Sequence, residues 1–310
     1  INRVVDTLTE YQGDKTGPVA RLANLCALTI KTEIYSACGA GCLAYTGMLL
    51  QGMVPRPAAV LAMVLYVFAM HTLNRLIDRK TSAGIGSFRE ETYQAHEKRY
   101  IGAALLSLVV SLILAATLGM GPFGLLLTLS ILGILYNTPI LPFRGRWRRL
   151  KDLPGSKNMS VALAWASVGA FLPALIDAPV FSPNIVVAFV FIFAMVFIRS
   201  SMSDLLDIQS DRLIGRETIP VVIGEKRTRQ LLTGVALMTG MVLIVSYALG
   251  WSSSLTLALL ACLFYILICF KLYDRRSGLS GVVLEGLLET SYIVTGAAAL
   301  MWVYATRFWT

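Results

Sequence analysis

Charged residues are scarce in this chain. Asp, Glu, Lys and Arg make up only 15% of the 310 residues, whereas hydrophobic residues make up 56%. An ordinary soluble domain is about 25% charged, and the mean hydropathy here is +0.69. The scarcity of charge excludes an ordinary soluble domain and predicts an integral membrane protein.

Two further features are missing. The five cysteines have no recurring metal-type spacing, and all lie in apolar stretches: Cys26, Cys38, Cys42, Cys262 and Cys269. We interpret them as buried small hydrophobic residues rather than disulfide partners or metal ligands. Residues 1–23 contain no apolar core of the kind a signal peptide has, so we expect a polar cytoplasmic arm there.

Long apolar runs, in contrast, are abundant. Stretches long enough to cross roughly 30 Å of hydrocarbon lie near residues 26–50, 57–78, 99–119, 121–138, 158–177, 184–206, 230–249, 253–273 and 284–305. We therefore predict an all-α, polytopic membrane helix bundle with nine transmembrane helices. We expect residues 1–310 to form a single domain.

Basic residues are distributed unevenly between the two predicted faces of the membrane. Of the 27 Lys and Arg residues, 22 fall in the segments 1–23, 79–100, 139–157, 207–229 and 271–283. The net charge of +9 therefore indicates topology rather than binding to nucleic acid. By the positive-inside rule the N-terminus and these loops are cytoplasmic, and the C-terminus lies on the opposite side. We expect a multi-pass protein of the cell inner membrane.

Three carboxylates follow one another at the polar end of the sixth apolar stretch. Asp204, Asp207 and Asp211 are spaced i, i+3, i+7, so a continuous helix places all three on one face. These like charges repel one another, and each costs roughly 2.5 to 3.5 kcal/mol at membrane depth. They are poor helix caps and poor interfacial residues. The pattern predicts a site for Mg²⁺ or Mn²⁺, which binds carboxylates together with phosphate oxygens of a substrate.

A second polar stripe ends the second apolar stretch, where His71, Asn74 and Asp78 also follow the spacing i, i+3, i+7. Both stripes precede charged loops on the basic side, which suggests two pseudo-repeated halves facing one central cavity that opens near the cytoplasmic face. Two simpler interpretations remain open. Asn74 and Asp78 can be interfacial or capping residues, and His71 can be a hydrogen-bonded structural residue.

The loop after the fourth stretch is strongly basic, with six Lys and Arg residues between positions 144 and 157. Topology alone predicts such a loop, and contact with anionic lipid would explain it. Its position beside two acidic stripes favours a second role, in which basic side chains clamp a phosphate group whose other oxygens contact metal. The candidates are Arg148, Lys151, Lys157 and, next to the third carboxylate, Arg212.

These motifs resemble the signatures of the UbiA superfamily of intramembrane prenyltransferases. The second signature, DxxDxxxD with its following Gly, Thr-x-Pro and Gly, is matched at Asp204, Asp207, Asp211, Gly215, Thr218, Pro220 and Gly224. The first signature, NxxxDxxxD, is met at Asn74 and Asp78 but has Ser82 in its third position. The segment YNTPILP at 136–142 is similar to the family's loop between spans four and five.

The resemblance implies Mg²⁺-dependent transfer of an isoprenyl group from a prenyl diphosphate to a lipophilic, often aromatic, acceptor within the membrane lipids. The implied metal ligands are Asn74, Asp78, Asp204, Asp207 and Asp211. The implied diphosphate-binding residues are Arg148, Lys151, Lys157 and Arg212. The implied catalytic residues are Asp78, Asp207 and Lys151, and His71 and Tyr136 are expected to line the substrate cavity. The alternative is an ion-coupled transporter that uses the intramembrane carboxylates.

Overall fold

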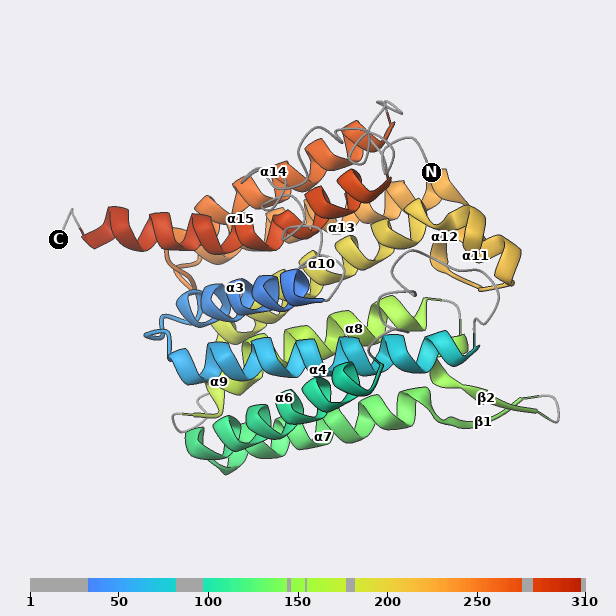
Figure 1. Cartoon of the computed structure of the whole chain (residues 1–310). Helices are drawn as coiled ribbons and strands as arrows, with labels where there is room; N and C mark the ends of the chain where they lie inside the picture. The colour runs from blue at the N-terminus through green and yellow to red at the C-terminus, as the bar shows by residue number, and fades with distance from the viewer. Residues whose placement is uncertain are drawn as a thin grey trace, which may run out of the picture.

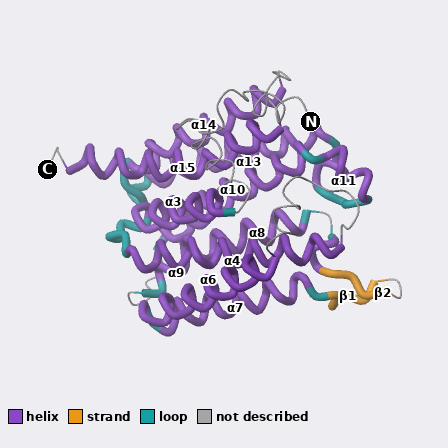
Figure 2. The backbone as a smooth tube through the Cα atoms, in the orientation of Figure 1, coloured by secondary structure: helices purple, strands orange, loops and turns teal. Residues whose placement is uncertain are grey.

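The structure is a computed structural model that describes residues 33–81, 97–143, 146–153, 155–176, 182–274 and 281–307. Within these ranges the chain is a bundle of long helices with one short β-hairpin at its edge (Figures 1 and 2). The predicted cytoplasmic arm, residues 1–23, and Ser82 lie outside the described residues.

Each of the nine predicted stretches contains a helix. In chain order the helices are α3 (Ile34–Leu50), α4 (Pro57–Thr81), α6 (Glu97–Leu118), α7 (Met120–Asn137), α8 (Ser156–Ala166), α9 (Leu172–Ala174), α10 (Pro183–Leu206), α11 (Ile208–Ile214), α12 (Ile219–Ile223), α13 (Glu225–Ala248), α14 (Leu255–Asp274) and α15 (Gly281–Arg307). A π-helical turn, Ser167–Phe171, joins α8 to α9. Helices form because hydrocarbon offers no partner for backbone polar groups, which must be satisfied within the segment.

Seven helices in the described part of the chain are long and apolar enough to cross a membrane, and α3 is a shorter apolar helix. The prediction of a multi-pass helical membrane protein is therefore confirmed. The count of nine spans stays a prediction.

The helices form a closed ring in chain order. Successive helices pack against one another from α3 through α4 and α6 to α7, and from α8 through α10, α13 and α14 to α15, which returns to pack against α3. Helix α7 joins the two series through its contacts with α9 and the π-helical turn. Inside this ring α10 also contacts α3 and α15. The polar end of α10 is thereby brought to the interior of the bundle.

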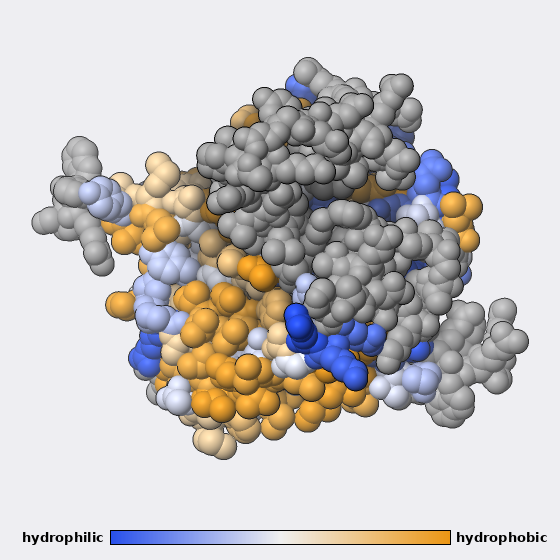
Figure 3. All heavy atoms as spheres, in the orientation of Figure 1, coloured by the Kyte–Doolittle hydropathy of each residue, from blue (hydrophilic) through white to orange (hydrophobic). Residues whose placement is uncertain are grey.

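The helices differ in how far the bundle covers them. In α10, 67% of the apolar window is buried, whereas in α6 and α7 only 17% is buried. Leu106, Ile113 and Ile134 are among the large apolar side chains that α6 and α7 expose, and the surface over these helices is largely hydrophobic (Figure 3). These faces suit contact with lipid, and α10 is the central helix.

Small residues allow α3 to approach its neighbours closely. A Cβ atom added to Gly47 would lie 2.6 Å from the backbone oxygen of Gly169 and 3.1 Å from Ile192. Gln51, just beyond the end of α3, donates a hydrogen bond of 3.1 Å to the backbone oxygen of Ala170 in the π-helical turn. Close backbone packing through glycine and a side-chain bond to a non-α turn are common in membrane helices.

The basic loop contains a β-hairpin that the sequence analysis did not predict. Strand β1 (Pro139–Phe143) pairs antiparallel with β2 (Arg146–Arg149), and Leu141 faces Arg148 in the register. Two prolines in β1 argue against a strand from sequence, but a two-stranded ribbon has only edge strands, where proline is tolerated. The all-α fold class therefore holds for the bundle, and the hairpin, which projects beside the end of α7 (Figure 2), is an addition that the prediction did not include.

Candidate functional site

The aspartate stripe lies where α10 gives way to α11. The continuous helix predicted through Asp204, Asp207 and Asp211 is wrong, because α10 ends at Leu206 and Asp207 forms the junction. Aspartate has a low helix propensity, which favours a break at this position. Two backbone hydrogen bonds still span the junction, from the Asp207 amide to Ser203 at 3.1 Å and from the Asp211 amide to Asp207 at 2.9 Å.

Asp204 is the most firmly held of the three carboxylates. It is 5% exposed, its Oδ2 accepts a hydrogen bond of 2.7 Å from Nδ2 of Asn158, and its Oδ1 lies 3.4 Å from Nζ of Lys157. Asn158 is itself 1% exposed, and its Oδ1 accepts a 2.6 Å hydrogen bond from Ser200 Oγ. Lys157 and Asn158, in the first turn of α8, therefore fix the first carboxylate of the stripe.

Asp207 is exposed and Asp211 is buried. Burial raises the pKa of Asp211, and the charges of Asp204 and Asp207 raise it further. Lys157 and Arg216 lower this pKa, but the nearest Arg216 nitrogen is 4.0 Å from the carboxylate. The stripe therefore carries negative charge that the neighbouring cations only partly neutralise.

No three His, Cys, Asp or Glu side chains converge to hold a metal ion within the described ranges. Magnesium in proteins usually binds through one or two carboxylates, with water and substrate phosphates completing its shell. The oxygen ligands and excess negative charge of the stripe therefore fit an ion that is shared with a phosphorylated substrate.

The stripe on α4 has different partners. Asn74 Oδ1 accepts a hydrogen bond of 2.6 Å from Nδ2 of Asn137, the last residue of α7. Asn137 Oδ1 in turn accepts a 3.0 Å hydrogen bond from Nζ of Lys151. These two hydrogen bonds link Lys151 to Asn74 through Asn137, which the sequence analysis did not select as a site residue. The third member, Asp78, is in α4, but its side chain lies outside the described residues.

The other predicted site residues are scattered around these two stripes. Lys157 reaches Asp204, Arg212 is exposed in the last turn of α11, and Tyr136 is half-buried near the end of α7. Arg148 lies in β2, and its side chain is outside the described residues. His71 Nε2 accepts a 3.2 Å hydrogen bond from Nε1 of Trp165.

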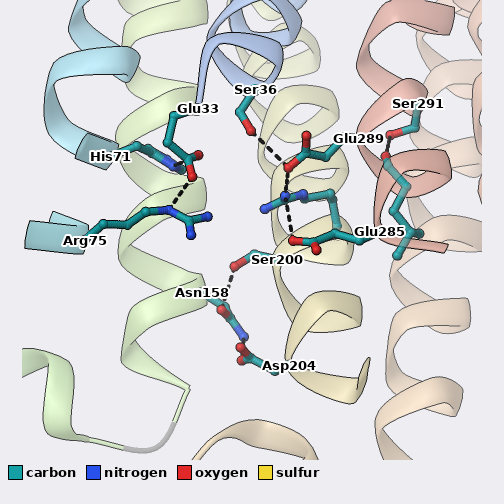
Figure 4. A network of polar contacts seen from close by, with 12 residues as sticks. Glu33, Ser36, His71, Arg75, Asn158, Ser200, Asp204, Glu285, Glu289 and Ser291 are labelled. Carbon is teal, nitrogen blue, oxygen red and sulfur yellow. Dashed lines mark hydrogen bonds and ion pairs between the residues drawn. The ribbon is translucent and has the colours of Figure 1, made fainter. Parts of the chain in front are cut away.

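A layer of ion pairs lies deeper in the bundle than the aspartates. Glu33, at the start of α3, pairs with Arg75 and lies 3.5 Å from His71 Nδ1. These three side chains point toward one another, as Figure 4 shows for the labelled Glu33, His71 and Arg75. The first half of the layer thus connects α3 to α4.

The second half of the layer connects α10 to α15 and α3. Arg199 of α10 pairs with Glu289 and lies 3.9 Å from Glu285, both on α15. Ser36 Oγ donates a 3.0 Å hydrogen bond to Glu289 (Figure 4). We call Glu33, Arg75, Arg199, Glu285 and Glu289 the ion-pair layer.

Sequence reasoning selected none of these residues as site residues. A signal for them was present, because opposite charges lie within separate apolar stretches, six to eight residues from one end of each helix. Arg75 is six residues before the end of α4, and Arg199 is seven before the end of α10. Glu289 is eight residues after the start of α15.

A comparison with family models identifies one family. The UbiA prenyltransferase family matches residues 40–283. A UbiA homolog from Archaeoglobus fulgidus bound to GPP and Mg²⁺ is 17% identical with a TM-score of 0.60, covering 87% of this chain and 99% of the homolog. The same homolog bound to DMAPP and Mg²⁺ is 19% identical with a TM-score of 0.59, covering 88% and 98%.

A third similar structure is the apo form of a UbiA homolog from Aeropyrum pernix K1. It is 14% identical with a TM-score of 0.65, and the match covers 86% of this chain and 97% of the homolog. A comparison with curated proteins gave no match. The transporter alternative receives no support from these comparisons.

Proposed function

This chain belongs to the UbiA prenyltransferase family, and from that membership we propose that it transfers an isoprenyl group from a prenyl diphosphate to a lipophilic acceptor. The single observation that carries this proposal is the arrangement of charge at the polar end of α10. Buried Asp204 and Asp211 lie with Asp207 on one side, and Lys151 approaches the α4 stripe on the other.

The aspartate stripe supports a role in binding magnesium. Asp204, Asp207 and Asp211 would hold Mg²⁺, or Mn²⁺, against the diphosphate, with Asn74 and Asp78 assisting from α4. The homolog from Archaeoglobus fulgidus, which has the same fold, is solved with GPP or DMAPP and Mg²⁺. The ion would stabilise negative charge that develops on the leaving group.

The basic residues would complete the diphosphate site. Lys151 and Lys157 would bind its oxygens, with Arg148 and Arg212 as outer contacts, because a positive charge near the leaving group lowers the barrier to its departure. The bond between C1 of the isoprenyl group and the diphosphate oxygen breaks, and its electron pair leaves with the diphosphate. The acceptor then bonds to C1 and loses one proton.

A row of phenylalanines supports a path for the isoprenoid tail. Phe189, Phe193 and Phe197 occupy every fourth position of α10, and their stacked ring centroids are 6.3 and 5.7 Å apart. Phe197 precedes Asp204 by seven residues, so both lie on one face of the helix. Phe189 and Phe193 are only partly buried. We expect the tail to run from the carboxylates along this row toward lipid.

The proposed orientation follows the basic residues. Strand β2, with Arg146, Arg148 and Arg149, and helix α11, with Arg212, lie at one end of the bundle, and α15 ends at the other (Figure 1). An excess of Lys and Arg marks the cytoplasmic side. The active site would then face the cytoplasm of the cell inner membrane.

The test is direct assay of the purified protein in lipid nanodiscs. The protein is incubated with GPP or DMAPP, Mg²⁺ and a panel of lipophilic phenols and alcohols, and prenylated products are identified by mass spectrometry. We expect a product whose formation stops when a chelator is added in excess. If no acceptor is prenylated and no diphosphate is released, the proposed function is wrong.

A further inference from the structure

The ion-pair layer carries more negative than positive charge. Its described members comprise three carboxylates, on Glu33, Glu285 and Glu289, against two guanidinium groups, on Arg75 and Arg199. The five residues form two groups: Glu33 pairs with Arg75, and Arg199 pairs with Glu285 and Glu289. The charges of Glu33 and Arg199 also interact between the two groups. Both guanidinium groups are thus already engaged by carboxylates.

His71 does not add a positive charge to this layer. Its Nε2 accepts a hydrogen bond from Nε1 of Trp165 at 3.2 Å, so this nitrogen carries a lone pair rather than a proton. The remaining nitrogen, Nδ1, then carries the proton and faces Glu33 at 3.5 Å. A neutral imidazole accounts for both contacts.

Three polar atoms in the layer have no hydrogen-bond partner in the described structure: Nε of Arg199, which is a donor, and Oε1 of Glu33 and Oε2 of Glu289, which are acceptors. Glu33 Oε1 is the atom that forms the ion pair with Arg75, which leaves Arg199 Nε and Glu289 Oε2 for a further partner. Glu289 is 2% exposed, and the two side chains are directly paired. A buried group without a partner is costly, so a bound group that satisfies both atoms would be favoured.

The ion-pair layer also lies deeper in the bundle than the aspartates, where the headgroup of an acceptor would have to bind. Arg199 precedes Asp204 by five residues, which is about 7.5 Å along a helix. The side chains of Ser200 and Asn158 connect this depth to Asp204 through hydrogen bonds of 2.6 and 2.7 Å. C1 of the isoprenyl group is bonded to the diphosphate, so the acceptor has to approach it from the deeper side.

We infer that the ion-pair layer selects a neutral acceptor headgroup bearing a hydroxyl, with Arg199 Nε donating a hydrogen bond to the hydroxyl oxygen and Glu289 Oε2 accepting a hydrogen bond from the hydroxyl. This inference rests on the proposed function and specifies its acceptor class. A hydroxyl both accepts and donates, so one group satisfies both atoms. A carboxylate or phosphate only accepts, and it would face the surplus negative charge of the layer.

The experiment compares two phenols that differ only in a para substituent, a carboxylate in one and its methyl ester in the other. Both are offered together to the protein in nanodiscs with GPP and Mg²⁺, and the ratio of the two products is measured. Because the ratio comes from one sample, it does not depend on how much of the protein is folded. We expect the ester product to exceed the acid product at least tenfold.

Glu289→Gln removes one negative charge while keeping the shape of the side chain. We expect it to shift the product ratio toward the acid by roughly tenfold, because like-charge repulsion against the anionic acceptor is reduced. Glu225→Gln, an identical change at an exposed position in the first turn of α13, is the matched control and should leave the ratio unchanged. If Glu289→Gln fails to fold, Glu285→Gln provides the same test and should shift the ratio in the same direction.

Several outcomes separate this inference from the proposed function. A wild-type protein that uses the acid as well as the ester overturns the selectivity. A ratio that does not move in either folded variant shows that the layer only holds the helices together, and it also overturns the inference. Absence of prenyl transfer to every acceptor, with no diphosphate released, refutes the proposed function itself.

Discussion

The polar stripes on α4 and α10 have the same spacing in sequence but different surroundings in the fold. On α10, Asp204 is buried and receives a hydrogen bond from Asn158 and an ion pair from Lys157. On α4, Asn74 is only partly buried and is linked through Asn137 to Lys151. One stripe concentrates negative charge, whereas the described part of the other has a neutral amide and a cation.

From this difference we propose a division of roles between the stripes rather than two equal metal sites. The α10 stripe has the carboxylates that a hard cation requires. On the α4 side, Lys151 is joined to Asn74 by the side chain of Asn137. A lysine is a good ligand for a phosphate oxygen. Ser82, which stands where the family signature has its last Asp, is consistent with a smaller contribution of α4 to metal binding. The following predictions test this division.

The largest expected effect is at Asp204. Asp204→Asn keeps the shape of the side chain but removes the charge, and we expect turnover to fall roughly 10³-fold, or about 4 kcal/mol of transition-state stabilisation. Asn74→Ala should lower turnover by only about tenfold, because the α4 stripe is expected to assist rather than to hold the metal. Product formation over a Mg²⁺ titration measures both.

Equal losses in the two variants would contradict the division of roles, as would a greater loss for Asn74→Ala. The control is thermal unfolding of each variant in detergent. It should remain close to wild type, because the fold depends mainly on packing between apolar helices.

The next largest effect is expected at the lysines. Lys151→Met should lower kcat/KM for the prenyl diphosphate by roughly 30-fold, since a charge-assisted contact to phosphate is lost. Lys157→Met should lower it less, because Lys157 is more than half exposed and already engages Asp204. Lys226→Met, at an exposed position of α13, is the control. An unchanged kcat/KM in Lys151→Met would remove this lysine from the site.

A smaller effect, on stability rather than chemistry, is expected from the amides that support each stripe. Asn158→Leu leaves the buried carboxylate of Asp204 without its hydrogen-bond donor, and it should destabilise the protein by about 1 to 3 kcal/mol. Asn137→Leu should cost less, because Asn137 is only partly buried. Unfolding in detergent, followed by tryptophan fluorescence, compares the two. A greater loss for Asn137→Leu would reverse the assignment of the more rigid stripe.

The smallest effect is expected from Ser82→Asp, which restores the family signature. A carboxylate added on the α4 side should attract the cation and lower the Mg²⁺ concentration for half-maximal activity by a few-fold. Ser82→Asn adds similar volume without charge and is the control. An unchanged Mg²⁺ requirement in Ser82→Asp would show that position 82 does not approach the metal.

The helical fold could be predicted from sequence because apolar runs of membrane-spanning length have few alternatives. The hairpin at Pro139–Arg149 could not, because its prolines oppose strand formation and only the edge position tolerates them. The aspartate stripe could be predicted from the spacing of Asp204, Asp207 and Asp211. The end of helix α10 before Asp207 could not, because it depends on local backbone geometry.

Supporting residues were the hardest to predict. Asn137 lies in the YNTPILP segment that the sequence analysis noted, but neither Asn137 nor Asn158 was selected. The importance of both comes from contacts with residues far along the chain, 46 positions away for Asn158 and 63 for Asn137. Glu289 reaches Arg199 from 90 positions away. Periodicity within one helix contains no information about such partners.

The closure of the ring by its last helix has a consequence for biosynthesis. Arg199 enters the membrane with α10, but Glu289 is made 90 residues later, which at 5 to 20 residues per second is a wait of roughly 5 to 18 seconds. During that interval the charge of Glu33, on the first described helix and already synthesised, is the counter-ion within reach of Arg199. A ribosome that stalls before α15 would therefore leave Arg199 in the bilayer without Glu289, its direct ionic partner. Such an incomplete protein exposes a feature that membrane quality control could recognise.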